Sequence, residues 1–132
     1  MTKGEKREIV FNLIFELKFG GREMTDIIND AKEARDERVG KYVENTATGV
    51  YENLPKIDEV ISQFSEKRSL KRLPSVSLAV MRLAVYEIMF CDDVPDSVAI
   101  SEAVRIAKKY GDDHDYSYIN GVLGAVSRSK EK

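Results

Sequence analysis

Residues 74–90, PSVSLAVMRLAVYEIMF, decide the fold that the sequence predicts. A helix over this stretch is apolar on almost every face, because Arg82 and Glu87 are the only charged residues in it. Such a helix belongs at the centre of a bundle, where other helices cover it. The stretch is too short to cross a bilayer core of about 30 Å, so we expect a buried helix and no membrane span.

Four more helices are expected before this central stretch. Apolar residues recur there at intervals of three and four, which is the period of an amphipathic helix. The first of these helices ends at Gly20-Gly21, and the third ends before Pro55, which disfavours helix at the residue preceding it. The four apolar stripes cover residues 9–17, 24–31, 39–50 and 57–64.

The region after the central stretch opens with Pro95 and several β-branched residues. We expect an extended lead-in over residues 94–100, and then a helix that Ser101 caps and Gly111 ends. The side chains expected to face the core are those of Ala103, Ala107 and Tyr110.

A last helix is expected over residues 119–126, where Gly121 and Gly124 would let another backbone come close. Asn120-Gly121 is also a hairpin signal, but no alternating strands flank it. No segment shows sustained alternation of period two, and no repeat is visible. The sequence therefore predicts an all-α bundle of about seven helices.

Composition and charge leave the choice of partner open. The chain has 132 residues, of which 42% are hydrophobic and 33% charged, so it can build one folded domain. The net charge of -2 gives no general support for nucleic-acid binding. Positive charge is nevertheless concentrated at the amino terminus and within residues 67–72, and the cations concerned are Lys3, Lys6, Arg7, Lys67, Arg68, Lys71 and Arg72.

No set of residues typical of a catalytic or metal site is present in the sequence. Cys91 is the only cysteine and His114 the only histidine, and there is no glycine-rich phosphate loop or nucleophile motif. The aspartates around His114 are best explained as a solvated acidic loop. We therefore expect a non-enzymatic protein with no cofactor and no small-molecule substrate. The polar amino terminus and the single cysteine favour the cytoplasm.

RNA binding needs aromatic surfaces as well as cations, because bases stack on aromatic rings. Phe64, Tyr116 and Tyr118 are the candidate aromatic residues, although Phe64 also falls on an apolar stripe that suits the core. On charge alone, solvation of the first helical turn explains the amino-terminal cations more readily than RNA binding does. Both interpretations remain open at this point.

Several short motifs follow one another along the chain. They are VMRLAVYEI (residues 80–88), DVP (93–95), ISEAV (100–104), AKKYG (107–111) and YINGVLG (118–124), preceded by Arg7-Glu8 and an apolar run to Phe15. Together they resemble the NusB family of transcription antitermination factors, and the resemblance covers essentially the whole chain.

The resemblance implies a NusB-like fold of two packed helical subdomains, at about residues 1–67 and 68–132. It also implies that the protein pairs with NusE, a ribosomal protein of the small subunit, and binds the boxA element of single-stranded nascent RNA. The complex would join other Nus factors on RNA polymerase and support processive transcription of ribosomal RNA operons. A monomer is sufficient for this role.

The resemblance assigns two groups of site residues. The RNA-binding residues it implies are Lys3, Lys6, Arg7, Phe64 and Tyr118. The residues it implies for the NusE interface are Phe15, Ser77 and Tyr86.

Three departures from the family pattern predict weak RNA binding by the protein alone. The amino terminus is shorter and less rich in arginine, Ser117 stands where a basic residue is common, and Phe64 lacks a tyrosine hydroxyl. NusE is then expected to complete the charged surface, because contacts by a docked partner become intramolecular. The acidic balance of the chain suits a basic ribosomal partner.

Two alternatives share the fold. One is the NusB-like RNA-binding domain of a ribosomal RNA cytosine methyltransferase, which requires a downstream cofactor-binding domain. The other is a helical adaptor that binds protein without RNA. Alanine substitution of the amino-terminal cations would separate RNA binding from adaptor function.

Overall fold

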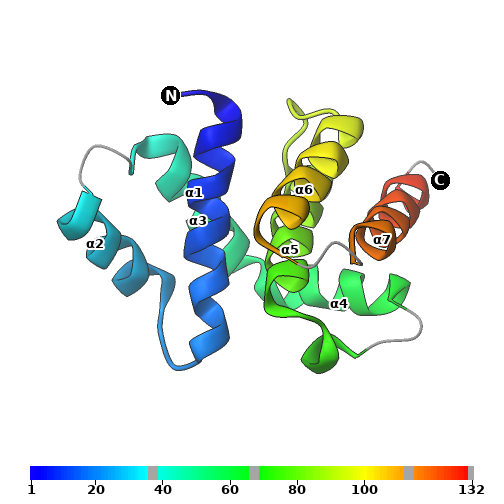
Figure 1. Ribbon diagram of the computed structural model, residues 1–132, viewed down its shortest axis with the longest axis horizontal. Coiled ribbons are helices and arrows are strands. Elements are labelled where there is room, and N and C mark those ends of the chain that lie inside the picture. Colours follow the sequence, from blue (N-terminus) through cyan, green and yellow to red (C-terminus); the bar gives the residue numbers. More distant parts are fainter. Residues whose placement is uncertain (36–38, 66–68, 112–114, 131–132) are drawn as a thin grey trace. The chain divides into compact units, whose positions relative to one another are not determined.

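A computed structural model describes residues 1–35, 39–65, 69–111 and 115–130. These residues form helices and no β strand, which confirms the all-α prediction (Figure 1). The α-helices are α1 (Lys3–Phe15), α2 (Met24–Arg35), α3 (Lys41–Glu52), α4 (Leu54–Phe64), α5 (Ser75–Phe90), α6 (Asp96–Tyr110) and α7 (Tyr116–Ser129). Two short 3-10 helices are η1 (Glu16–Phe19) and η3 (Leu70–Arg72). None of the helices described is both long enough and apolar enough to cross a bilayer.

The chain divides into two compact units, Met1–Glu52 and Asn53–Lys132. The sequence analysis placed the division at residues 67 and 68, which lie outside the described residues. The units divide earlier because α4 packs against α5 and α7. Helix α4 therefore belongs to the carboxy-terminal unit.

In the amino-terminal unit, α1 packs against both α2 and α3. A capping box starts α1: the Thr2 hydroxyl accepts a hydrogen bond from the Glu5 backbone amide, and the Glu5 carboxylate accepts one from the Thr2 amide. Gly20 and Gly21 both have φ near 70°, a left-handed conformation that glycine adopts without strain. The chain therefore turns after η1, where the sequence predicted that the first helix would stop.

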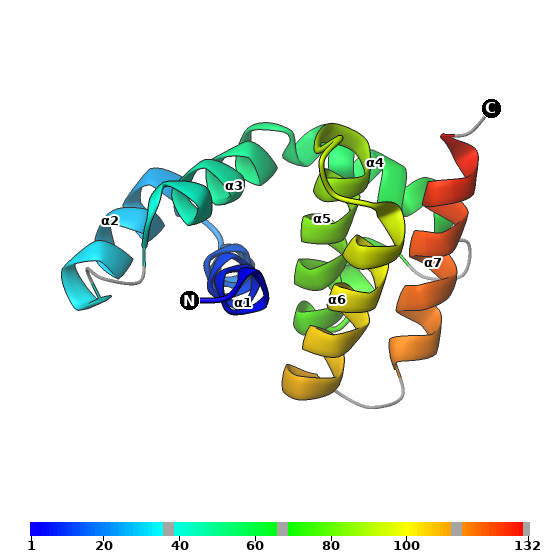
Figure 2. The same ribbon diagram turned by 90° about the horizontal axis from the view of Figure 1, so that it is seen from above.

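In the carboxy-terminal unit, α5 is the central helix and packs against α4, α6 and α7, with α6 and α7 also in contact with each other (Figure 2). Val80, Met81 and Val85 are fully buried, as expected for a helix apolar on almost every face. Arg82, one of its two charged residues, forms two hydrogen bonds of 2.9 Å with the carboxylate of Asp58 on α4. This pairing lets a cation lie on the central helix without losing its hydrogen bonds.

The start of α6 differs from the sequence prediction. The helix begins at Asp96, directly after Pro95, and residues 96–100 are helical and not extended. Proline has a fixed φ that suits the beginning of a helix, so Pro95 starts α6 and does not delay it. Ser101 is consequently inside the helix, where its hydroxyl donates a hydrogen bond to the Val98 carbonyl. The predicted cap at Ser101 was wrong.

Two of the three side chains predicted to face the core from α6 are buried, and the third is not. Ala103 and Ala107 are buried, but Tyr110 is 42% exposed. Tyr110 is the last residue of α6, at the end of the stripe that the neighbouring helices cover. Correct helical phase was therefore not sufficient to bury it.

The glycines of α7 do not mark a close approach of another backbone, contrary to the prediction. A Cβ atom on Gly121 would meet nothing within 4 Å, and one on Gly124 would meet only the end of the Arg128 side chain. Gly111 is the crowded glycine instead, because an added Cβ there would lie 3.0 Å from a side-chain methyl carbon of Val76.

Candidate functional site

Two of the predicted RNA-binding cations converge on one aromatic ring in the amino-terminal unit. The Nζ atoms of Lys3 and Lys6 lie over the ring of Tyr42, at 4.5 and 5.9 Å from its centroid. The packing of α1 on α3 brings these residues together. Lys3 is exposed, and Lys6 and Tyr42 are half-buried. Ammonium groups are attracted to the negative face of a tyrosine ring, so Tyr42 holds two cations at one place.

Arg7, the third predicted cation, is buried at 5% exposure. Val10, Phe11 and Ile14 follow it at intervals of three, four and seven residues, and all three are in the core. Residues at these intervals share one face of a helix, so Arg7 lies on the buried face of α1. A buried guanidinium offers little surface to RNA. Of the three predicted amino-terminal cations, Lys3 and Lys6 therefore remain as candidates for RNA contact.

The two predicted aromatic positions lie in one region of the carboxy-terminal unit. The Tyr118 hydroxyl forms a hydrogen bond with the hydroxyl of Ser65, the residue directly after α4. Phe64 precedes Ser65 directly, and both Phe64 and Tyr118 are half-buried. The end of α4 and the first turn of α7 therefore meet, and this contact brings Phe64 and Tyr118 into the same neighbourhood.

The basic run at residues 67–72 has four cations, and the structure describes two of them. Lys67 and Arg68 lie outside the described residues. Lys71 and Arg72 are exposed on η3, which packs against α4. These two cations belong to the same unit as the aromatic pair Phe64 and Tyr118.

Ser77, one of the three predicted partner contacts, is an internal residue. It is 3% exposed, and its hydroxyl donates a hydrogen bond of 2.9 Å to Oδ2 of Asp115, which is also buried. Residues this deeply buried do not meet a partner at a surface, so the assignment of Ser77 to the NusE interface is not supported by its position. Sequence analysis could not find the bond, because its partners are far apart in the chain.

Tyr86 and Phe15, the other two predicted partner contacts, both reach the surface. The Tyr86 ring lies 5.6 Å from the ring of Phe90, an exposed residue at the end of α5 that the sequence analysis did not single out. The Phe15 ring packs 5.9 Å from Phe11 and carries Lys18 Nζ at 4.2 Å from its centroid. Each residue therefore belongs to a small aromatic cluster on its own unit.

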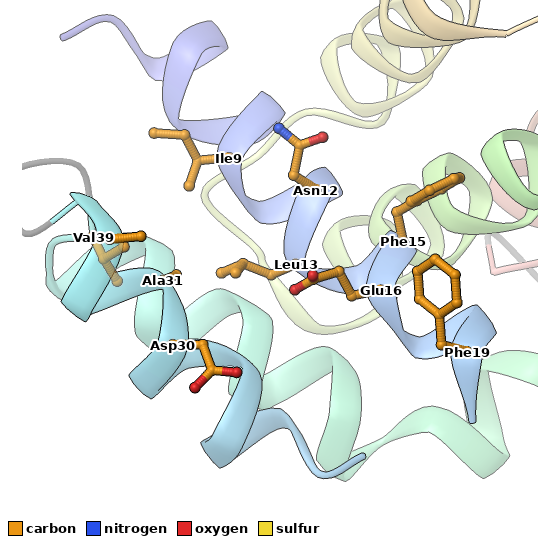
Figure 3. A pocket seen from close by; sticks show the side chains of 10 residues that line it. Ile9, Asn12, Leu13, Phe15, Glu16, Phe19, Asp30, Ala31 and Val39 are labelled. Carbon is orange, nitrogen blue, oxygen red and sulfur yellow. The ribbon is translucent and has the colours of Figure 1, made fainter. Parts of the chain in front are cut away.

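Phe15 also lines a cavity of about 590 Å³ in the amino-terminal unit. Figure 3 shows the residues of α1, η1 and α2 around it. The apolar part of the lining consists mainly of Ile9, Leu13, Phe15, Phe19, Ala31 and Val39. Asn12, Glu16 and Asp30 add polar atoms, but no group of residues in this lining is typical of a catalytic site.

Within the described part of the chain, no group of three or more histidine, cysteine or acidic residues could hold a metal ion. Asp112, Asp113 and His114, which the sequence analysis interpreted as part of an acidic loop, lie outside the described residues. Asp115 belongs to the buried pair with Ser77 and is not on a solvated loop.

The Asp96 carboxylate has a lowered pKa. Partial burial raises the pKa of Asp96, but hydrogen bonds from Lys130 and Ser127 and the positive charge of Lys130 outweigh it, so the pKa is lowered. The Lys130 ammonium lies 2.7 Å from Oδ1 and the Ser127 hydroxyl 2.6 Å from Oδ2. This arrangement joins the start of α6 to the end of α7 and is a structural feature of the unit.

Comparison with known proteins gives a consistent result. The sequence model of the NusB family matches residues 4–128. The chain is 38% identical to the transcription antitermination protein NusB of Natranaerobius thermophilus, with 100% of this chain and 99% of the relative covered. It is 40% identical to the protein of that name from Pseudothermotoga lettingae, with coverages of 98% and 94%.

Solved structures agree with the sequence comparison. The structure of T. maritima NusB has a TM-score of 0.85 and 35% sequence identity, and the match covers 97% of this chain and 92% of that one. A structure of antitermination factors NusB and NusE in complex with double-stranded RNA also has a TM-score of 0.85, with 96% of each chain covered. At 21% identity, this second likeness shows the fold alone. The relatives are non-enzymatic factors, which confirms the prediction that the protein is not an enzyme. The chain belongs to the NusB family.

Proposed function

We propose that the protein is a cytoplasmic transcription antitermination factor that binds boxA RNA jointly with NusE and supports transcription of ribosomal RNA operons. The curated relatives carry the name transcription antitermination protein and are covered over nearly their full length. The observation on this chain that carries the proposal is the convergence of Lys3 and Lys6 on Tyr42.

The RNA contacts combine charge and stacking. Lys3 and Lys6 supply ammonium groups for phosphates, and each neutralised phosphate of a single strand adds about -0.7 to the log-salt slope of binding. Tyr118 supplies an aromatic ring near Phe64, and stacking of a base on such a ring contributes about 1–3 kcal/mol. With so few contacts, the protein alone binds RNA weakly.

NusE completes the complex. Once NusE docks, its own RNA contacts act at a high effective concentration, so the joint affinity exceeds that of either protein. The half-buried ring of Phe15 and the cluster of Tyr86 with the exposed Phe90 supply apolar contact area for docking. Other Nus factors and RNA polymerase are reached through this complex and not through separate sites.

The test is a titration of fluorescent boxA RNA, followed by anisotropy, with the protein alone and with equimolar NusE. We expect weak binding by the protein alone and much tighter binding with NusE. Equal affinity in the two titrations would contradict joint binding.

A pair of variants tests the amino-terminal lysines. The double variant Lys3→Ala/Lys6→Ala is expected to weaken RNA binding and to reduce the salt slope by about 1.4, for two lost phosphate contacts. The charge-matched control Lys32→Ala/Lys56→Ala removes two lysines that form surface ion pairs with Glu44 and Glu59. Normal NusE binding without RNA binding in the wild-type protein would identify it as an adaptor.

A further inference from the structure

A second exposed pairing of lysine and tyrosine lies in the carboxy-terminal unit. The Nζ atom of Lys108, near the end of α6, lies 4.6 Å from the centroid of the Tyr116 ring, at the start of α7. Tyr116 is 43% exposed, and Lys108 is exposed as well. Neither side chain is therefore needed to fill the core.

The position of Tyr116 is related to that of Tyr118. Two residues on a helix are separated by about 200° of rotation, so the two tyrosines lie on opposite flanks of the first turn of α7. Tyr118 is joined to Ser65 at the end of α4, and Tyr116 is joined to Lys108 at the end of α6. Ser117 is exposed between them.

We propose that Tyr116 and Lys108 form a second base-stacking position for single-stranded RNA, on the flank of α7 opposite Tyr118. The inference rests on the proposed RNA-binding function and adds residues that the family resemblance did not assign. A strand that crosses the exposed face at Ser117 meets one tyrosine on each side. It therefore has two stacking positions on one rigid helix.

The relative strengths of two contacts explain how the pair accepts a base. An exposed lysine gains less from a tyrosine ring than a nucleobase gains from stacking on it. An arriving base therefore displaces the Lys108 ammonium from the ring. The freed ammonium stays within reach of the adjacent phosphate, because its side chain is long and flexible. Tyr116 thus contacts the base and Lys108 the backbone.

The chain offers a matched control at Tyr110. This tyrosine is 42% exposed and also has a lysine over its ring, Lys109, at 5.3 Å. Lys109 is its neighbour in the chain, so this pair does not join two helices. We assign no RNA contact to Tyr110.

The absence of tryptophan from the sequence makes a direct test possible. Tyr116→Trp introduces the only tryptophan of the chain, which can be excited selectively over the tyrosines, and Tyr110→Trp places a single tryptophan at the control position. With NusE present, RNA is expected to quench the fluorescence at position 116 by stacking and to leave that at position 110 unchanged. Equal quenching at both positions, or none at either, would overturn the inference.

Affinity measurements supply the second readout. Tyr116→Leu is expected to weaken RNA binding by the NusE complex at least about fivefold, while Tyr116→Phe and Tyr110→Leu stay near wild type. Lys108→Gln is expected to reduce the salt slope by about 0.7. Thermal unfolding of each variant, followed by circular dichroism, checks that the fold is intact.

The failure of this inference differs from the failure of the proposed function. If the wild-type complex binds RNA and needs Lys3 and Lys6, but Tyr116→Leu has no effect, only the second stacking position is wrong. If Tyr116→Leu weakens NusE binding and not RNA binding, the pair is a protein contact and the inference is overturned. If the wild-type complex does not bind RNA, the proposed function fails together with it.

Discussion

The Ser77 hydroxyl donates a hydrogen bond of 2.9 Å to Oδ2 of Asp115, and the two residues are only 3% and 8% exposed. The bond joins the first turn of α5 to the residue directly before α7. It therefore helps to determine where α7 begins. Tyr116 and Tyr118, the two tyrosines proposed to stack on RNA, are in the first turn of that helix.

Removing this hydrogen bond is expected to destabilise the protein. Ser77→Ala leaves a buried carboxylate without one of its donors, and such a loss costs about 1–3 kcal/mol. Urea unfolding followed by circular dichroism measures the change. Ser101→Ala is the control, because its hydroxyl is exposed and bonds only within its own helix. A free energy of unfolding equal to that of the control would show that the buried bond contributes nothing.

Replacing Gly121 with alanine is expected to stabilise α7. A Cβ atom there meets nothing within 4 Å, and alanine in a helix is more favourable than glycine by about 1 kcal/mol. Gly121→Ala should therefore raise the melting temperature. The opposite result is expected for Gly111→Ala, because a Cβ there would lie 2.9 Å from the Ala107 carbonyl oxygen. Destabilisation by Gly121→Ala would mean that another group approaches this glycine.

The Asp96 carboxylate is expected to make the stability depend on pH in the acid range. Although partial burial raises its pKa, the hydrogen bonds and charge of Lys130 and the hydrogen bond of Ser127 outweigh this effect and hold the pKa below its ordinary value. A group with a lowered folded pKa stabilises the protein above its unfolded pKa, and that stabilisation is lost as the pH falls through the folded pKa.

The variant Asp96→Asn tests this pH dependence. Its free energy of unfolding should be lower than that of the wild type by a constant amount at neutral pH, and the difference should shrink below about pH 4. Denaturant unfolding at a series of pH values measures it. A difference that persists unchanged at the lowest pH would show that the ionised carboxylate is not responsible.

Tyr42 is expected to act on RNA through the two lysines that lie over its ring. Tyr42→Leu removes the ring that holds the two lysines in place, a contact worth about 0.5–1 kcal/mol, and the loss of this preorganisation should weaken RNA binding by up to about two- to fivefold. Tyr42→Phe keeps the ring and should bind normally. In the Lys3→Ala/Lys6→Ala background, Tyr42→Leu should have no further effect. A full effect in that background would mean that Tyr42 contacts RNA directly.

Much of the architecture could be predicted because helical periodicity is a local property. The apolar residues of the central stretch predicted a buried helix, and α5 is the central helix of its unit. The burial of Arg7 was also present in the sequence, because Val10, Phe11 and Ile14 follow it at helical intervals.

The sequence by itself determined the all-α class and the order of the helices, because these follow from the local spacing of apolar residues. It also determined membership of the NusB family, because the family's motifs follow one another along the chain. Only the tertiary structure decided which polar side chains pair with one another in the interior and which aromatic rings have lysines over them. Ser77 and Asp115 are 38 residues apart, and Lys3 and Tyr42 lie on different helices. The physical reason is that such contacts depend on how helices pack, and the periodicity of one helix contains no information about the side chains of another.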